Sequence, residues 1–223
     1  MIGVHRLHLT DVTPAPSLPW ARPTFPVFAY LVLHPEAPIL IDTGVGIGNE
    51  MIDELYSPVH HDLDEALDRH GVRIEDVAIV ITSHLHFDHC GQNHRFARSR
   101  IIVQQAEVEA AKAPMYTVPE WAFPPSVDLE VIEGDHEVAS GVSVVATPGH
   151  TPGHQSVLIE DRNGTRTIVC CQASWNVGSF EAATLGDGGR DEAAGVASLK
   201  KLHALDPDRL LLSHDPNEWQ PRR

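Results

Sequence analysis

The stretch HLHFDH, residues 84–89, decides how the rest of this chain can be interpreted. It follows the apolar run 77–81, which is short, β-branched and bounded by polar residues, and is therefore predicted to be a buried strand. In extended backbone alternate side chains share a face, so His84, His86 and Asp88 are expected to point together beyond the strand's end. His89 joins them if the chain turns into a helix there. Three imidazoles and a carboxylate suit one or two divalent metals, zinc above all.

Two later segments favour a metal site over a polar loop that is merely rich in histidine. TPGHTPGH occupies residues 147–154, and Ser213 and His214 follow the last apolar run. The histidines at positions 5, 8, 34, 60, 61, 70, 94, 136 and 203 lie outside these motifs and are treated as ordinary surface or core residues.

Length and composition limit the classes of protein to consider. The 223 residues fit one domain spanning 1–223, and 42% hydrophobic with 21% charged residues is typical of a globular chain. A net charge of -15 disfavours nucleic acid and anionic membranes as partners. There is no apolar run of ~20 residues and no signal-peptide core. Cys90, Cys170 and Cys171 do not form an even disulfide set, which favours the reducing cytoplasm. The sequence leaves a monomer and a homodimer both open.

Apolar runs and turn signals predict strands and helices that alternate along the chain. The predicted strands are 27–33, 39–41, 77–81, 101–103, 129–132, 142–146, 155–160, 167–171 and 210–212, those from 129 to 171 in antiparallel style. The predicted helices are 62–71, 106–112 and 192–205, with a glycine-rich loop at 178–190. This order indicates two sheets with helices outside them. Asp42 ends the strand 39–41, where it is either a site residue or a turn-former.

Two segments rich in proline and aromatic residues, 14–26 and 113–125, interrupt this alternation. Each either caps the core or forms the wall of an apolar cleft. We expect residues 14–28 and 114–125 to converge beside the metal site, with Phe25 and Trp121 near His84.

The order of these motifs resembles that of the metallo-β-lactamase superfamily. The chain has Asp42-Thr43-Gly44, then HLHFDH, then TPGH, then Ser213-His214, so the resemblance covers nearly its whole length. HLHFDHCG and TPGHTPGHQS look most like the N-acyl-homoserine lactonase branch. The resemblance implies an α/β fold, a four-layer αββα sandwich with a metal pair at one edge.

The resemblance also implies a role for each motif residue. By position, His84, His86 and His150 match the family's ligands for a first metal. Asp88, His89 and His214 match those for a second. His154 matches a structural histidine, and Asp42 an acid that orients a metal-binding imidazole.

The chain departs from the family pattern at two positions. Gln172 stands where the family has an aspartate that bridges both metals, and Trp175 stands where lactonases have a tyrosine that contacts the substrate. Two dications ~3.5–4 Å apart repel strongly, and a bridging carboxylate normally offsets this. A neutral amide cannot do so. We therefore predict one tightly bound zinc or other divalent metal and a second site that is weak or empty.

The sequence thus predicts a metal-dependent hydrolase of a small lactone or ester with an apolar part. A metal-bound hydroxide would attack the carbonyl, and Asp88 would hold the water or protonate the leaving alkoxide. One alternative is a mono-metal enzyme of a specialised pathway that catalyses a different hydrolysis, elimination or cyclisation. Another is a non-catalytic, metal-stabilised binding protein, against which the retention of Asp88 argues.

Overall fold

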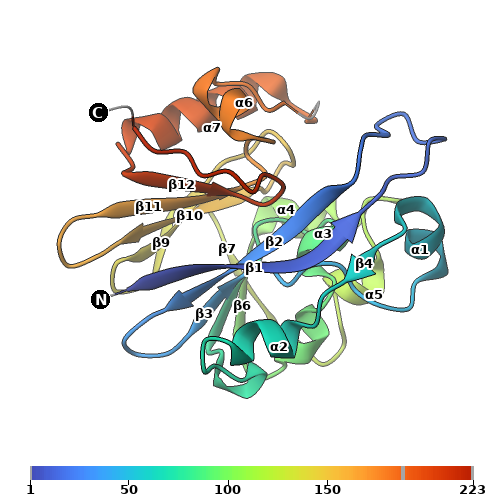
Figure 1. Cartoon of the computed structure of the whole chain (residues 1–223), viewed down its shortest axis with the longest axis horizontal. Coiled ribbons are helices and arrows are strands. Elements are labelled where there is room, and N and C mark those ends of the chain that lie inside the picture. Colours follow the sequence, from blue (N-terminus) through green and yellow to red (C-terminus); the bar gives the residue numbers. More distant parts are fainter. Residues whose placement is uncertain (1, 187–188, 222–223) are drawn as a thin grey trace.

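The computed structural model describes residues 2–186 and 189–221. The predicted domain 1–223 and the glycine-rich stretch 178–190 therefore each include residues outside these ranges. Two β-sheets lie face to face with helices on their outer faces, which confirms the predicted αββα sandwich (Figure 1). Among the described residues, no helix is both long and apolar enough to cross a bilayer.

The first sheet has seven strands in the order β4-β1-β2-β3-β5-β6-β7. Their bounds are β1 Gly3–Val12, β2 Phe25–Leu33, β3 Ile39–Ile41, β4 Val59–His60, β5 Ile79–Ile81, β6 Arg100–Gln104 and β7 Leu129–Ile132. Strands β3, β5, β6 and β7 run parallel, so their carboxyl ends meet at one edge of the sheet.

The second sheet has five strands in the order β12-β11-β10-β9-β8. Their bounds are β8 His136–Ala139, β9 Val142–Ala146, β10 Gln155–Glu160, β11 Arg166–Cys171 and β12 Arg209–Leu212. Both β9 and β11 run antiparallel to β10, and β12 runs parallel to β11. The carboxyl ends of β9, β11 and β12 therefore share one edge.

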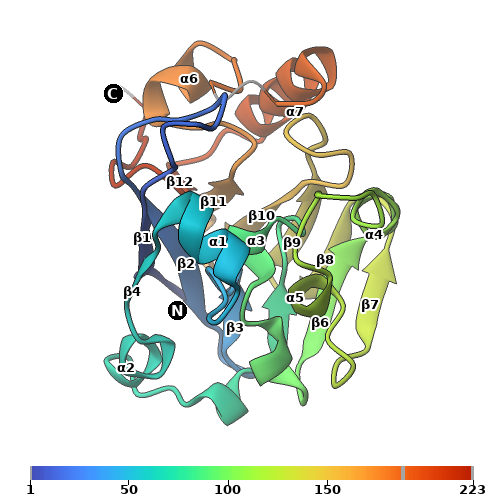
Figure 2. The same ribbon diagram turned by 90° about the vertical axis from the view of Figure 1, so that its right-hand side faces the viewer.

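Helices cover the outer faces of both sheets. They are α1 Glu50–Tyr56, α2 Leu63–Asp68, α3 Phe87–Cys90, α4 Gln105–Ala110, α5 Pro119–Ala122, α6 Val177–Glu181 and α7 Glu192–Ala204, with 3-10 turns at Ile74–Asp76 and Asn93–Phe96. Helices α6 and α7 lie on the second sheet and α2 lies on the first (Figure 1). Helices α4 and α5 lie beside β6 and β7, at the side away from β4 (Figure 2).

The two sheets are joined by a buried apolar layer and by hydrogen bonds across it. Ile41, Ile81, Val144 and other buried side chains from both sheets form one core cluster. The Tyr30 hydroxyl on β2 donates to the Leu212 carbonyl at the end of β12, at 2.6 Å. Such a buried bond fixes the edge where the strand ends of both sheets meet.

Several predictions from the sequence need correction. Elements β1, β4, β8, α1, α5 and α6 were not predicted, because short or partly exposed elements lack a clear apolar period. Strand β7 pairs parallel with β6 rather than antiparallel, since an apolar run does not reveal its partner. The histidine cluster at residues 84–89 was expected in extended backbone, and this is also wrong. Strand β5 ends at Ile81, and α3 begins at Phe87, so a loop and a helix carry the candidate ligands.

Candidate metal centre

The candidate residues all follow the ends of strands that share one edge of the sandwich. Asp42 follows β3, the 84–89 cluster follows β5, His150 and His154 lie between β9 and β10, Gln172 follows β11, and His214 lies just beyond β12. The strand pairings align these ends within each sheet, and the packing of the two sheets brings both sets together, although Asp42 and His214 are 172 positions apart. Each candidate residue therefore reaches the cluster from a short segment beyond a strand end.

Two of these strand ends have a backbone conformation that is unusual for residues with a Cβ. Asp42 has φ +62° and Cys171 has φ +54°, in the left-handed region. The conformation at Cys171 coincides with a register shift between β11 and β12. Such strained residues often occur at functional sites. The turn at Asp42 directs its carboxylate towards the cluster, and the turn at Cys171 directs the following residue, Gln172, towards it.

The first triad consists of His84, His86 and His150, whose candidate ligand atoms lie within 4.8 Å of one another. Nδ1 of His86 is 3.0 Å from Nε2 of His84 and 3.1 Å from Nε2 of His150. The Ser83 hydroxyl donates its one hydrogen to Asp42, at 2.8 Å, so it accepts from Nδ1 of His84. The proton of His84 is thus on Nδ1, and its Nε2 presents a lone pair to the other two rings.

Burial and mutual repulsion favour the uncharged forms of His84 and His86. Burial, together with the neighbouring His89, holds the pKa of His84 well below its ordinary value. Burial and then His150 do the same to the pKa of His86. Neutral imidazoles with converging lone pairs are the form that binds a metal. The donor set of the first triad therefore fits a divalent cation.

The second triad consists of Asp88, His89 and His214, again with candidate ligand atoms within 4.8 Å of one another. An oxygen of Asp88 lies 3.6 Å from Nε2 of each histidine. Nδ1 of His89 donates to Asp42 at 2.8 Å. Burial alone would lower the pKa of His89, but the charges of Asp88 and Asp42 outweigh it and raise the pKa to about 9. This triad thus contains both a carboxylate and a protonated ring.

Gln172 lies at the second triad. Its Oε1 is 3.1 Å from Nε2 of His89 and 3.2 Å from Nε2 of His214. Nδ1 of His214 lies 3.0 Å from the carbonyl oxygen of Pro26, to which it donates its proton. Burial lowers the pKa of His214 to about 4, so the ring is neutral and its Nε2 is an acceptor. Two acceptors facing each other at this distance fit a site for a cation.

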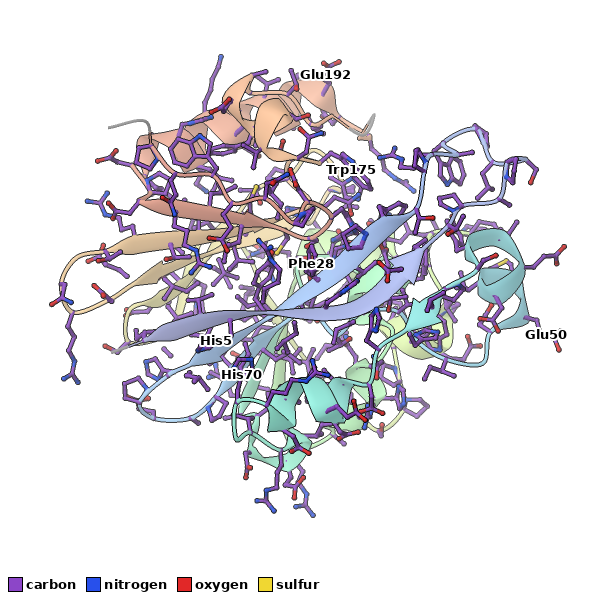
Figure 3. All side chains as sticks on the ribbon, viewed as in Figure 1. His5, Phe28, Glu50, His70, Trp175 and Glu192 are labelled. Carbon is purple, nitrogen blue, oxygen red and sulfur yellow. The ribbon has the colours of Figure 1, made fainter. Side chains whose placement is uncertain are left out.

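The other two predicted residues contact this cluster differently. Nε2 of His154 accepts the backbone N–H of Gln172 at 3.2 Å, so this nitrogen supports the β11 turn. Trp175 stacks on His214, with ring centres 4.6 Å apart and an interplanar angle of 25°. In Figure 3, Trp175 lies towards the loop between β1 and β2. His5 and His70, which are outside the candidate site, lie together away from Trp175.

Glu107 is a supporting residue that the sequence did not indicate. Its side chain is fully buried at the start of α4. It accepts hydrogen bonds from the backbone of Leu85 and Gly153 and from the hydroxyls of Tyr116 and Thr151. A Cβ at residue 153 would lie 2.1 Å from the Glu107 nitrogen, so this approach needs glycine. Glu107 thus joins both ligand loops, but in sequence it looks like any acid on a surface helix.

A pocket of about 390 Å³ opens over both triads. Residues 14–28 contribute Pro14, Trp20, Arg22 and Phe25 to its lining, and residues 114–125 contribute Met115 and Tyr116. The two segments converge there as expected. Trp121, however, is only 8% exposed and packs in a core cluster with Leu85 and Cys90. Its apolar side chain therefore supports the ligand loop from behind instead of lining the pocket.

Comparisons with known proteins agree with this geometry. Residues 22–214 match the sequence model of the metallo-beta-lactamase superfamily. The chain is 38% identical over 189 residues to an N-acyl homoserine lactonase of a Bacillus species, covering 79% of this chain and 75% of the relative. It is 28% identical over 224 residues to the N-acyl homoserine lactonase AttM of Rhizobium radiobacter, covering 87% and 83%.

Solved structures give the same result. One is an N-acyl homoserine lactone hydrolase with the product N-hexanoyl-L-homoserine bound at its catalytic metal centre. It superposes with a TM-score of 0.78 at 30% identity, covering 96% of this chain and 93% of that one. The quorum-quenching dizinc lactonase AidC superposes with a TM-score of 0.71 at 20% identity, covering 96% and 88%, and shares the fold.

Proposed function

The chain belongs to the metallo-beta-lactamase superfamily as a lactonase-like metallo-hydrolase, and we propose that it opens a small lactone or ester with an apolar part. One observation carries the proposal. Both triads border a single pocket whose walls include Trp20, Phe25 and Trp175. A carbonyl at the base of this pocket would lie beside the metal ligands, and an acyl chain would contact the aromatic walls.

The ligand chemistry supports zinc held first by His84, His86 and His150, and then more weakly by the second triad. When bound, a divalent cation polarises the carbonyl and makes a water more acidic. Gln172 contributes no charge between the two triads, which supports unequal occupancy.

The protein's own residues would bind substrate and move the proton. Asp88 lines the pocket, and its carboxylate would orient a water, accept its proton and pass that proton to the leaving alkoxide. The bond formed is between the water oxygen and the carbonyl carbon, and the bond broken is that to the alkoxide. The indole of Trp175 also lines the pocket and offers one N–H donor there.

The compartment belongs to the same proposal. Cys90, Cys170 and Cys171 are buried free thiols, and burial raises the pKa of each. Free thiols are typical of reducing compartments, which supports the cytoplasm.

The test is hydrolysis of N-hexanoyl-homoserine lactone and of γ-butyrolactone by zinc-loaded protein, followed as acid release in a pH-stat. We expect ring opening that chelation abolishes and added zinc restores. Asp88→Asn should reduce kcat by ~10²-fold or more because a positioned acid–base group is lost. His94→Ala, an exposed residue near the cluster, is the control. Zinc-loaded protein that hydrolyses neither lactones nor simple esters would contradict the proposal.

A further inference from the structure

Two arginines line the pocket over the triads, Arg22 from the loop between β1 and β2 and Arg190 just before α7. Neither forms an ion pair with a carboxylate of the described chain, in contrast to Arg6, Arg100 and Arg209. The sequence has 31 acidic and only 16 basic residues. Both guanidinium groups at the pocket thus have no acid partner among residues 2–186 and 189–221, although acids outnumber bases in the chain.

Arg190 lies one aromatic ring away from the first triad. Its guanidinium carbon is 4.7 Å from the centre of the Tyr116 ring, and that ring is centred 5.0 Å from the ring of His86. The backbone N–H of Arg190 donates to the carbonyl of His150 at 3.4 Å. Tyr116 is itself fixed by its hydrogen bond to the buried Glu107.

Arg22 has a matching position at the second triad. Its guanidinium carbon is 4.0 Å from the centre of the Trp175 ring, which stacks on His214. Its Nε donates to the carbonyl of Trp20 at 3.4 Å. At each triad, an aromatic ring packs on one histidine, and a guanidinium group on the pocket wall packs on that ring.

This arrangement suits recognition of a carboxylate. A guanidinium group that stacks on an aromatic face keeps its N–H donors in the plane of the group, and this planar fork matches the two oxygens of a carboxylate. Asp88 is the one acid among the described residues of the pocket lining, and it belongs to the second triad. The partner of the arginines is therefore expected on the ligand.

We propose that the substrate is an anionic lactone or ester, with a carboxylate bound by Arg22 and Arg190 in addition to the carbonyl that is attacked. This inference rests on the proposed function and narrows its substrate class. The net charge of -15 repels anions from most of the surface, so local positive charge at the pocket is needed for such a substrate to enter.

A matched pair of substrates tests the inference on the full-length, zinc-loaded protein. N-hexanoyl-homoserine lactone and N-adipoyl-homoserine lactone have the same acyl length, but only the second ends in a carboxylate. We expect kcat/KM to be about tenfold or more higher for the adipoyl lactone, as is typical of a charged hydrogen bond. The kcat/KM value for the adipoyl lactone should fall with added salt, because salt screens the attraction between its carboxylate and the arginines.

Variants assign the preference to the two arginines. Arg22→Gln and Arg190→Gln should each lower the ratio of kcat/KM values, adipoyl over hexanoyl, by about tenfold. Arg98→Gln is the matched control, because Arg98 also has no ion pair in the described chain but lies at a different pocket. A ratio at or below one that neither variant changes would overturn the inference.

Binding separates this inference from the proposed function. If neither lactone is hydrolysed and γ-butyrolactone and simple esters are not hydrolysed either, the proposed function fails, and calorimetric titration of both homoserine lactones decides the inference alone. Tighter binding of the adipoyl lactone that is lost in Arg22→Gln and Arg190→Gln supports it. Equal affinities for the two lactones overturn it.

Discussion

The first and second triads border the same pocket but are built from different ligands. The first has three imidazoles, and burial keeps the pKa values of His84 and His86 well below their ordinary values. The second has one carboxylate and two imidazoles, and Asp88 and Asp42 raise the pKa of His89 to about 9 in spite of its burial. A cation at the first triad therefore meets neutral rings at His84 and His86, whereas one at the second competes with the proton that the raised pKa keeps on His89.

Charge and burial together therefore determine which of the two adjacent sites binds a cation more tightly. Two dications at ~3.5–4 Å need negative charge between them. Gln172 supplies an amide oxygen at the second triad but no charge. A third cluster, His8, Asp11 and His61, has the same residue types as the second triad but lies at the protein surface. It allows the effect of burial to be separated from that of ligand type.

Breaking the first triad should have the largest effect. His84→Ala and His150→Ala should each lower bound metal and thermal stability together, because a cation that binds only the folded state stabilises it by about 4 kcal/mol at 1,000 times its dissociation constant. Metal content by mass spectrometry and melting by calorimetry measure both quantities. His94→Ala is the control, since His94 is exposed. Full metal content and unchanged melting in both triad variants would show that the ligands are assigned wrongly.

The sequence indicated the candidate ligand residues that the fold brings together, because the information in each of their loops is local. The cluster at 84–89 and the TPGH repeat carry their ligands at fixed spacing, and strand 39–41 matches β3 residue for residue. Contacts between distant segments could not be predicted in this way. Nothing near Glu107 in sequence indicates that it accepts hydrogen bonds from two ligand loops.

Arg190 at the pocket and strand β1 were not predicted for the same reason, because both depend on contacts between distant segments. Arg190 follows a glycine-rich stretch, and its position over Tyr116 depends on how α7 packs. Strand β1 has four charged or histidine residues that pair with β2, namely His5, Arg6, His8 and Asp11, and they obscure its apolar face. A pattern of burial that depends on the partner strand cannot be read from one strand alone.

Restoring charge at position 172 should make the two triads more equal. Gln172→Asp should raise metal content from about one towards two per chain, because a carboxylate offsets the repulsion between dications. Gln172→Asn is the matched control, as it has the same size as aspartate but no charge. Metal is counted after dialysis of each protein purified without added metal.

Two outcomes at position 172 would change the comparison. Wild-type protein that retains two full metals through dialysis would refute the electrostatic ranking of the triads. If two metals bind and Gln172→Asp abolishes a native activity, the glutamine serves a different reaction, and the alternative of a specialised pathway enzyme is favoured.

The smallest effect on stability and metal content is expected at the third cluster, His8, Asp11 and His61. Asp11 lies 2.9 Å from Nε2 of His8 and 3.1 Å from Nε2 of His61, and its side chain is 34% exposed. Burial is the largest single influence and raises the pKa of Asp11, but the hydrogen bonds and charges of His61 and His8 together outweigh it and lower the pKa below the ordinary 3.8. A lowered pKa stabilises the folded state above pH 3.8, and this contribution is lost as the pH falls through the pKa in the folded state.

Asp11→Asn should therefore lower the free energy of unfolding by at most about 1 kcal/mol near pH 6, as for other exposed pairs. The difference from wild type should shrink as the pH falls below 3.8, because Asp11 is protonated first in the unfolded chain and then, at its lowered pKa, in the folded protein. Metal content after dialysis should not change, because solvent competes for exposed ligands. Urea unfolding at both pH values and metal analysis measure the two effects. A clear loss of metal in Asp11→Asn would show that ligand type, without burial, is enough to hold a cation in this protein.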